Sequence, residues 1–237
     1  FKDMTKIETR HVQSYLEKRM VAGIEYGTWN KEAAHLAKFG NALDRYDGKE
    51  RGFRDSIEDL RSLAKDHLPR SSKKFGGFQH PGRVYHNLND KYALAAKIQH
   101  EGGARLREAS LIKESQLRGL QVDPITGQEK GVIHLIDTKG GKPRDIQVTP
   151  ATYKKIELAI KDSGEIRVDR SAYRAAVSRA AKAAGEQRTG THDFRYCFAK
   201  ARYDEVVSKG YTHEQALQQV SWEMGHERAD ITTLYLR

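Results

Sequence analysis

The chain has 237 residues, of which 38% are hydrophobic and 31% are charged, so it can bury one large core or two small ones and is not disordered by composition. No apolar run approaches the roughly 20 residues that cross a membrane, no secretory signal opens the chain, and its single cysteine, Cys197, excludes an internal disulfide. The net charge of +10 is spread over both halves, which is typical of proteins with an extended polyanionic partner such as duplex nucleic acid. A basic protein without a special partner is the alternative. Because the chain begins with Phe1 rather than Met, we expect a fragment or a processed chain.

The first part of the chain is predicted to be a small all-helical domain over residues 1–68. One helix is expected over residues 5–20, and a second is expected to begin at Thr28 as its N-cap. A third covers residues 53–68 and is ended by Pro69.

Residues 69–83, PRSSKKFGGFQHPGR, are rich in Pro, Gly, Ser and basic side chains and have no hydrophobic period. This composition predicts a basic interdomain linker, to which we assign residues 69–84. Such a linker between two basic domains would let the pair close around a rod-like ligand.

The second domain is predicted over residues 85–237 and mixes helices with a hairpin. A helix is expected after Asn89 or Asp90, and a short one through residues 105–113. Residues 132–137 and 144–148 alternate around the turn TKGGKP, which predicts a β-hairpin. Further helices are expected at the following starts: Thr149-Pro150, Asp169, Thr191 and Thr212. The fold class is therefore mostly α with a small antiparallel sheet, in two domains.

Common metal and nucleotide sites find no support in the sequence. There is no CxxC pair, and His100 and His213 each begin an HExxH pattern that lacks its second histidine. No Walker A or GxGxxG motif occurs. The sequence predicts no cofactor and no metal.

The residues that could carry chemistry are scattered along the second domain. Arg105 lies one turn before Glu108, and Lys139 is at the predicted hairpin tip. His192 and Arg195 are one turn apart at a helix start, hence on one face. His226 follows a glycine, and Tyr235 comes nine residues later. Taken singly, each is an ordinary surface charge or packing residue.

The order of these elements resembles the tyrosine recombinases, also called the phage-integrase family, over nearly the whole chain. The resemblance implies that residues 1–68 are a core-binding DNA-binding domain and that residues 85–237 are the catalytic domain. It implies that Arg105 and Arg195 are catalytic arginines, that Lys139 is the hairpin lysine, and that Tyr235 is the nucleophile. His192 and His226 match the family's remaining catalytic positions, and Glu108 matches an acidic residue that supports the first arginine.

The implied activity is site-specific cutting and rejoining of double-stranded DNA, as in recombination, integration or transposition. The two arginines would hold the nonbridging phosphate oxygens while Tyr235 forms a 3′-phosphotyrosine link. Lys139 would protonate the leaving 5′ oxygen, with Lys142 and Arg144 as alternatives on the same hairpin. Type IB topoisomerases and telomere resolvases share this chemistry, and a DNA-binding module without catalysis is the alternative from another class.

The family resemblance also implies partners and a location. We expect a dimer on each DNA site, a tetramer in the synapse, and help from accessory DNA-bending proteins. A cytoplasmic, nucleoid-associated protein of bacterial, phage or mobile-element origin is expected, without membrane contact.

Overall fold

The chain forms two compact units, Phe1–Lys74 and Phe75–Arg237. Its computed structural model describes residues 3–70, 76–138, 140–161, 163–226 and 228–236. Within the described residues, no helix combines the length and the apolar character needed to cross a membrane.

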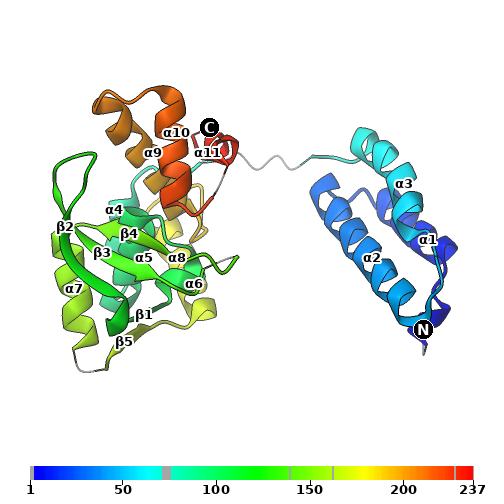
Figure 1. Cartoon of the computed structure of the whole chain (residues 1–237), viewed down its shortest axis with the longest axis horizontal. Coiled ribbons are helices and arrows are strands. Elements are labelled where there is room, and N and C mark those ends of the chain that lie inside the picture. The colour runs from blue at the N-terminus through cyan, green and yellow to red at the C-terminus, as the bar shows by residue number, and fades with distance from the viewer. Residues whose placement is uncertain (1–2, 71–75, 139, 162, 227, 237) are drawn as a thin grey trace. The chain divides into compact units, whose positions relative to one another are not determined.

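The first unit is a small helical bundle around one tryptophan (Figure 1). Trp29 is fully buried, and its indole Nε1 donates a hydrogen bond to the carbonyl oxygen of Leu16 at 3.0 Å. The second helix begins after Glu25 rather than at the predicted cap Thr28. The elements are the 3-10 turn η1 (Met4–Lys6) and helices α1 (Thr9–Val21), α2 (Tyr26–Asp47) and α3 (Phe53–His67).

The second unit starts earlier than the sequence predicts. Residues 81–86, which straddle the end of the predicted linker, form helix α4 (Pro81–His86), with proline in its first turn. Val84 is fully buried in the main core, and the ring of Phe78 packs edge-on against Phe194 at 4.7 Å between centroids. Much of the predicted linker 69–84 therefore belongs to this unit. The Pro- and Gly-rich composition of this segment suggests a linker, but its tertiary contacts bury Phe78 and Val84 in the core.

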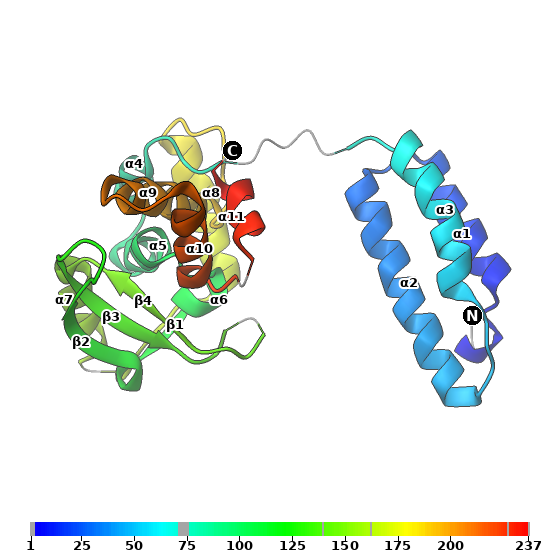
Figure 2. The same cartoon turned by 45° about the horizontal axis from the view of Figure 1, so that its top comes forward.

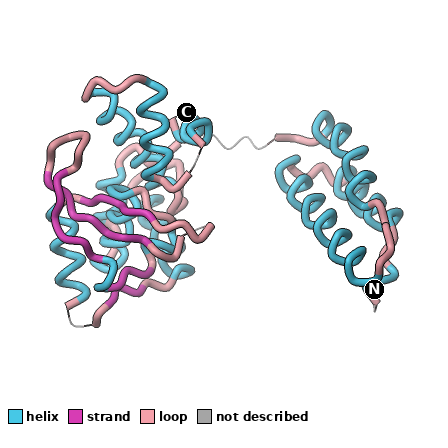
Figure 3. The backbone as a smooth tube through the Cα atoms, in the orientation of Figure 1, coloured by secondary structure: helices cyan, strands magenta, loops and turns pink. Residues whose placement is uncertain are grey.

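The described residues of the second unit form two antiparallel sheets, where the sequence predicts one (Figure 3). The predicted hairpin is confirmed, with Ile133 opposite Ile146. The predicted short helix is half wrong: it ends at Ala109, and the next residues form a strand that pairs with Glu165–Arg167. The sheets contain β2 (Leu117–Val122), β3 (Glu129–Leu135) and β4 (Arg144–Val148), and β1 (Leu111–Lys113) with β5 (Glu165–Arg167).

The helices of the second unit begin close to their predicted caps. Asn89, Thr149, Asp169 and Thr212 each accept a hydrogen bond from a first-turn N–H. The exception is Thr191, because the N-cap is the next residue, His192. The helices are α5 (Asp90–Gly102), α6 (Leu106–Ala109), α7 (Pro150–Ile160), α8 (Arg170–Ala183), α9 (Asp193–Ser208), α10 (His213–Glu223) and α11 (Ala229–Tyr235).

Helices α9, α10 and α11 lie together at one end of the unit (Figure 2). They share a small cluster of buried side chains that contains Phe198, Met224 and Tyr235. Helix α5 packs between α9 and strand β4. This packing brings the start of α6, the start of α9, the end of α10 and the end of α11 to one region.

Candidate active site

A buried carboxylate organises one side of this region. Glu108 in α6 is 5% exposed, and its Oε2 accepts a hydrogen bond from the backbone N–H of Arg105 at 2.7 Å. Its Oε1 accepts from Arg105 Nη1 at 3.1 Å. Arg144, at the start of β4, donates to the same two oxygens from Nη1 at 2.9 Å and Nη2 at 2.6 Å. One carboxylate therefore holds two guanidinium groups.

The second predicted catalytic arginine is completely enclosed. Arg195 in α9 has no exposed surface, and its Nη1 donates to the carbonyl oxygen of Gly103. Gly103 ends α5 with φ +62°, a left-handed conformation that glycine adopts without strain. Arg195 Nε is buried and finds no hydrogen-bond partner among the described residues. Burial, together with the charges of Arg105 and Arg144, lowers the pKa of Arg195 to about 10, so it stays charged at neutral pH.

The carboxyl end of α10 binds all three arginines. The carbonyl oxygen of Glu223 accepts from Arg144 Nε at 3.1 Å, that of Met224 from Arg195 Nη2 at 3.1 Å, and that of Gly225 from Arg105 Nη2 at 3.0 Å. The last carbonyls of a helix lack partners within it and carry partial negative charge. They therefore hold three like-charged groups close together without adding carboxylates that would cancel the charge.

Tyr235 faces this cluster from the end of α11. Its hydroxyl lies 3.0 Å from His192 Nε2, and the side chain is 9% exposed. The rings of His192, His226 and Tyr196 surround the Tyr235 ring, with centroid distances of 5.7, 5.4 and 4.5 Å. The phenol is thus fixed in orientation, and a neutral His192 can accept its proton.

Both histidines are neutral at physiological pH. Loss of hydration, reinforced by Arg195 and Arg105, lowers the pKa of His192 to about 4, although the residue as a whole is exposed. The same causes, with Arg144 added, lower the pKa of His226 to about 4. Arg195 Nη2 lies 3.4 Å from His226 Nε2, which must accept, so the proton of the neutral ring is on Nδ1. That buried Nδ1 has no partner among the described residues and is available as a donor.

These pKa values predict how stability depends on pH. Unfolded histidine titrates near 6.5, above the folded value of about 4 for His226, so the unfolded chain binds more protons between these values. The free energy of unfolding should therefore fall as the pH is lowered from about 6.5 to about 4. Denaturant unfolding of the wild type and of His226→Gln at pH 7 and pH 5 measures this, and the variant should lose less stability than the wild type over that interval.

The comparison with the variant is needed because burial also lowers the pKa of His100 in the core, which contributes in the same interval in both proteins. Equal losses in the wild type and in His226→Gln would mean that His226 is not held neutral.

Gly225 lets the arginines approach the end of α10. Its φ is +66°, and a Cβ there would lie 3.1 Å from Arg144 Cδ and Nη1 and 3.3 Å from Arg105 Nη1. Gly225→Ala should cost about 1–2 kcal/mol of stability for the left-handed backbone and should displace both guanidinium groups. Gly210→Ala is the matched control, because Gly210 has φ +89° and nothing within 4 Å of its Cβ position.

Thermal unfolding, and the DNA cleavage that the family resemblance implies, should be measured on both variants. We expect similar losses of stability and a large loss of cleavage only in Gly225→Ala. Equal cleavage by the two variants would contradict a role for Gly225 in packing the arginines.

Six of the seven residues predicted from the sequence lie together. Contacts link Arg105 to Glu108, Arg195 to His226, and His192 to Tyr235. The end of α10 binds both arginines, and the rings of His226 and Tyr235 are in contact. Lys139 lies outside the described residues. Arg144 is the residue that sequence reasoning missed as a member of the cluster, because its partner Glu108 is 36 positions away.

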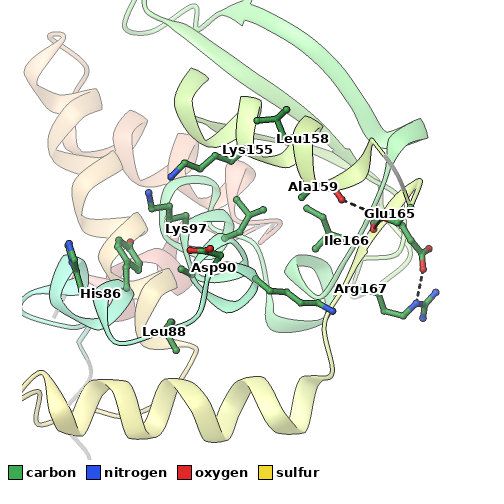
Figure 4. Close-up of a pocket in the computed structure, with 15 residues that line it drawn as sticks. His86, Leu88, Asp90, Lys97, Lys155, Leu158, Ala159, Glu165, Ile166 and Arg167 are labelled. Atoms are coloured by element: carbon green, nitrogen blue, oxygen red, sulfur yellow. Dashed lines mark hydrogen bonds and ion pairs between the residues drawn. The ribbon is translucent and has the colours of Figure 1, made fainter.

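A second feature of the described residues is a groove away from this site. A groove of about 1170 Å³ lies between α5, α7 and β5, with Lys97 and Lys155 among its lining residues, and contains none of the predicted site residues (Figure 4). Among the described residues, no group of histidine, cysteine and carboxylate side chains is arranged to hold a metal ion.

No protein-family model matches the chain, and no curated protein matches it. Solved structures do match it. The XerH site-specific recombinase bound to palindromic difH substrate in a post-cleavage complex has a TM-score of 0.63 and 16% identity, over 99% of this chain and 68% of that one. A lambda integrase dimer bound to a COC′ core site has a TM-score of 0.61 and 14% identity, over 99% and 65%.

The Tn1549 transposon integrase in complex with transposon right end DNA has a TM-score of 0.60 and 15% identity, over 99% of this chain and 82% of that one. At these identities the likeness concerns the fold. The chain has the fold of the site-specific tyrosine recombinases and integrases.

Proposed function

We propose that this protein cuts and rejoins DNA strands through a covalent link between Tyr235 and a 3′ phosphate. The observation that carries the proposal is the position of the Tyr235 hydroxyl, 3.0 Å from His192 Nε2 and beside a cluster of three arginines. Two buried donors, Arg195 Nε and His226 Nδ1, find no partner among the described residues. Donors of this kind suit the nonbridging oxygens of a phosphodiester.

The proposed first step is attack by Tyr235 on phosphorus. The phenol proton passes to neutral His192, and Oη forms a bond to phosphorus while the bond to the 5′ oxygen breaks. Arg105, Arg195 and His226 stabilise the charge that develops on the nonbridging oxygens. The leaving 5′ oxygen needs a proton, for which Lys139 is proposed from the family resemblance. Attack by another 5′ hydroxyl reverses the step and rejoins the strands.

The finer assignments also belong to this proposal. Residues 1–68 would act as the core-binding domain and the second unit as the catalytic domain, with a dimer on each site and a tetramer in the synapse. A type IB topoisomerase or a telomere resolvase would use the same step. A DNA-binding module without catalysis is disfavoured because Tyr235 contacts His192, Arg195 contacts His226, and Arg105 binds the carbonyl oxygen of Gly225 beside them.

The proposal is tested with a library of nicked DNA duplexes, since a nick beside the cleaved bond lets the short leaving strand diffuse away and traps the adduct. The protein should form an SDS-resistant complex that retains a label placed on the strand upstream of the cut, whose 3′ phosphate it holds. Sequencing the trapped DNA gives the target site. A complex that retains only the downstream label, or no complex from any member of the library, would contradict the proposal.

DNA binding should depend steeply on salt, because the net charge of +10 is spread over both units. Contacts to several phosphates by each unit predict a log–log slope of about −4 to −8 for the full chain. Fluorescence anisotropy with one labelled duplex at several salt concentrations measures the slope. A slope near zero, or the same slope and affinity for residues 76–237 alone, would contradict binding by both units.

A further inference from the structure

Arg144 has no role in the proposed chemical step, yet each nitrogen of its guanidinium donates a hydrogen bond at the site. All three nitrogens donate: Nη1 and Nη2 to the Glu108 carboxylate, and Nε to the carbonyl oxygen of Glu223. The side chain is 9% exposed and that of Glu108 is 2% exposed. A fork-to-fork pair of this kind is the strongest arrangement that arginine makes with a carboxylate.

The charges of the cluster explain why a second arginine on Glu108 matters. Glu108 orients Arg105 through two hydrogen bonds, but an orienting carboxylate also cancels the positive charge that it holds. Among the described residues, the cluster contains three guanidinium groups and one carboxylate, which leaves two positive charges in excess when both histidines are neutral. A phosphodiester carries one negative charge and approaches two in a pentavalent transition state. Without Arg144, this excess would fall to one positive charge before the phenol proton reaches His192.

We infer that Arg144 is a positioning residue that neutralises Glu108, so that Glu108 can fix the orientation of Arg105 without weakening its attraction for the reacting phosphate. The inference rests on the proposed function. Arg144 acts through Glu108 and Arg105 and does not contact DNA. Burial opposes ionisation of Glu108, but the hydrogen bonds and charges of Arg144 and Arg105 together outweigh it and lower the pKa of this carboxyl to about 2.

The alternative is an ion pair that serves stability alone. Removing one partner of a buried pair destabilises a protein whatever the function of the pair, and removing both is often neutral. Stability therefore does not separate the two roles. The two roles are separated by the cleavage rate of the folded enzyme at saturating DNA and by the ionisation of Glu108.

The first experiment follows adduct formation at saturating DNA by the wild type, Arg144→Gln, Arg144→Lys, and the double variant Glu108→Gln with Arg144→Gln. Arg144→Gln should be slower by about 10²-fold at pH 7 with unchanged DNA affinity, as when one charge-stabilising group is lost. Arg144→Lys and the double variant should recover part of the rate, because neither has an uncompensated carboxylate. Arg51→Gln, which breaks the partly buried ion pairs with Asp44 and Asp47 in the first unit, is the control for destabilisation and should cleave at the wild-type rate.

The pH profile gives a sharper signature. The charged groups that act on Glu108 are Arg105 at the N-cap of α6, Arg144 on β4 and Arg195 on α9. Without Arg144, Glu108 should take up a proton more readily, which removes its negative charge. The rate of Arg144→Gln relative to wild type should therefore rise as the pH is lowered from 8 to 5. The double variant should show no such rise. A wild-type rate for folded Arg144→Gln, or a flat pH ratio with a double variant as slow as the single one, would overturn the inference.

The second experiment needs no activity. Carbon-13 NMR of the Glu108 carboxyl should show it titrating at a higher pH in Arg144→Gln than in the wild type. An unchanged titration overturns the neutralising role of Arg144. A wild type that forms no adduct contradicts the proposed function instead, and the NMR result still decides the charge relation between Arg144 and Glu108.

Discussion

Replacing Tyr235 with phenylalanine is expected to abolish the covalent adduct while leaving DNA binding unchanged. Phenylalanine keeps the ring in the cluster with Phe198 and Met224 and removes only the hydroxyl that contacts His192. The loss of one hydrogen bond should cost about 0.5–1.5 kcal/mol of stability, so the variant remains folded. Because the hydroxyl oxygen is the proposed nucleophile, no other atom of the side chain can replace it.

The measurement is denaturing electrophoresis of each protein with the trapped DNA substrate. Tyr203→Phe is the matched control: it also loses a hydroxyl that contacts a histidine, His213, and Tyr203 packs against the same cluster. That control should form the adduct at the wild-type level. An adduct that persists in Tyr235→Phe would show that another residue attacks.

Replacing Arg105 with glutamine should lower the cleavage rate by about 10²–10³-fold, the effect of losing one preorganised charge-stabilising group. Arg105 is partly exposed, so its removal disturbs the core less than removal of fully buried Arg195. Its loss also leaves Gly225 O and Glu108 without one donor each. DNA affinity should fall only slightly, because most of the binding comes from other phosphate contacts.

Arg107→Gln is the control for Arg105→Gln. Arg107 lies on the same short helix but points to solvent and pairs with Asp137. Single-turnover cleavage at saturating DNA should be near the wild-type rate in Arg107→Gln. Similar rates for the two variants would remove Arg105 from the site.

Much of the fold was predictable because local signals determine helix ends. Asn89, Asp169 and Thr212 cap helices where the sequence places them, since each can accept a first-turn N–H whatever its distant surroundings. The hairpin was predictable for a similar reason: alternation and the glycine turn lie within one short segment.

The errors have a common cause, which is contact between distant residues. Leu111–Lys113 is a strand only because Glu165–Arg167, more than 50 positions away, supplies its partner. Phe78 belongs to the core because Phe194 packs on it, and nothing near Phe78 in the sequence indicates this. Propensity and composition carry no information about such partners.

The candidate site divides in the same way. The ordered residue types, with Arg105 first and Tyr235 last, could be recognised from the sequence as a resemblance to a family. Binding of the three arginines by the end of α10 could not be recognised from the sequence, because backbone carbonyls have no sequence signature. Arg144 was visible only as a hairpin cation, and its pairing with buried Glu108 depends on β4 lying beside α6.

The most direct test is to identify the residue that carries the DNA. The trapped wild-type adduct would be digested with protease and nuclease, and the modified peptide sequenced by mass spectrometry. We predict a nucleotide remnant joined through its 3′ phosphate to the oxygen of Tyr235. A remnant on any other residue, or one joined through a 5′ phosphate, would contradict the central claim.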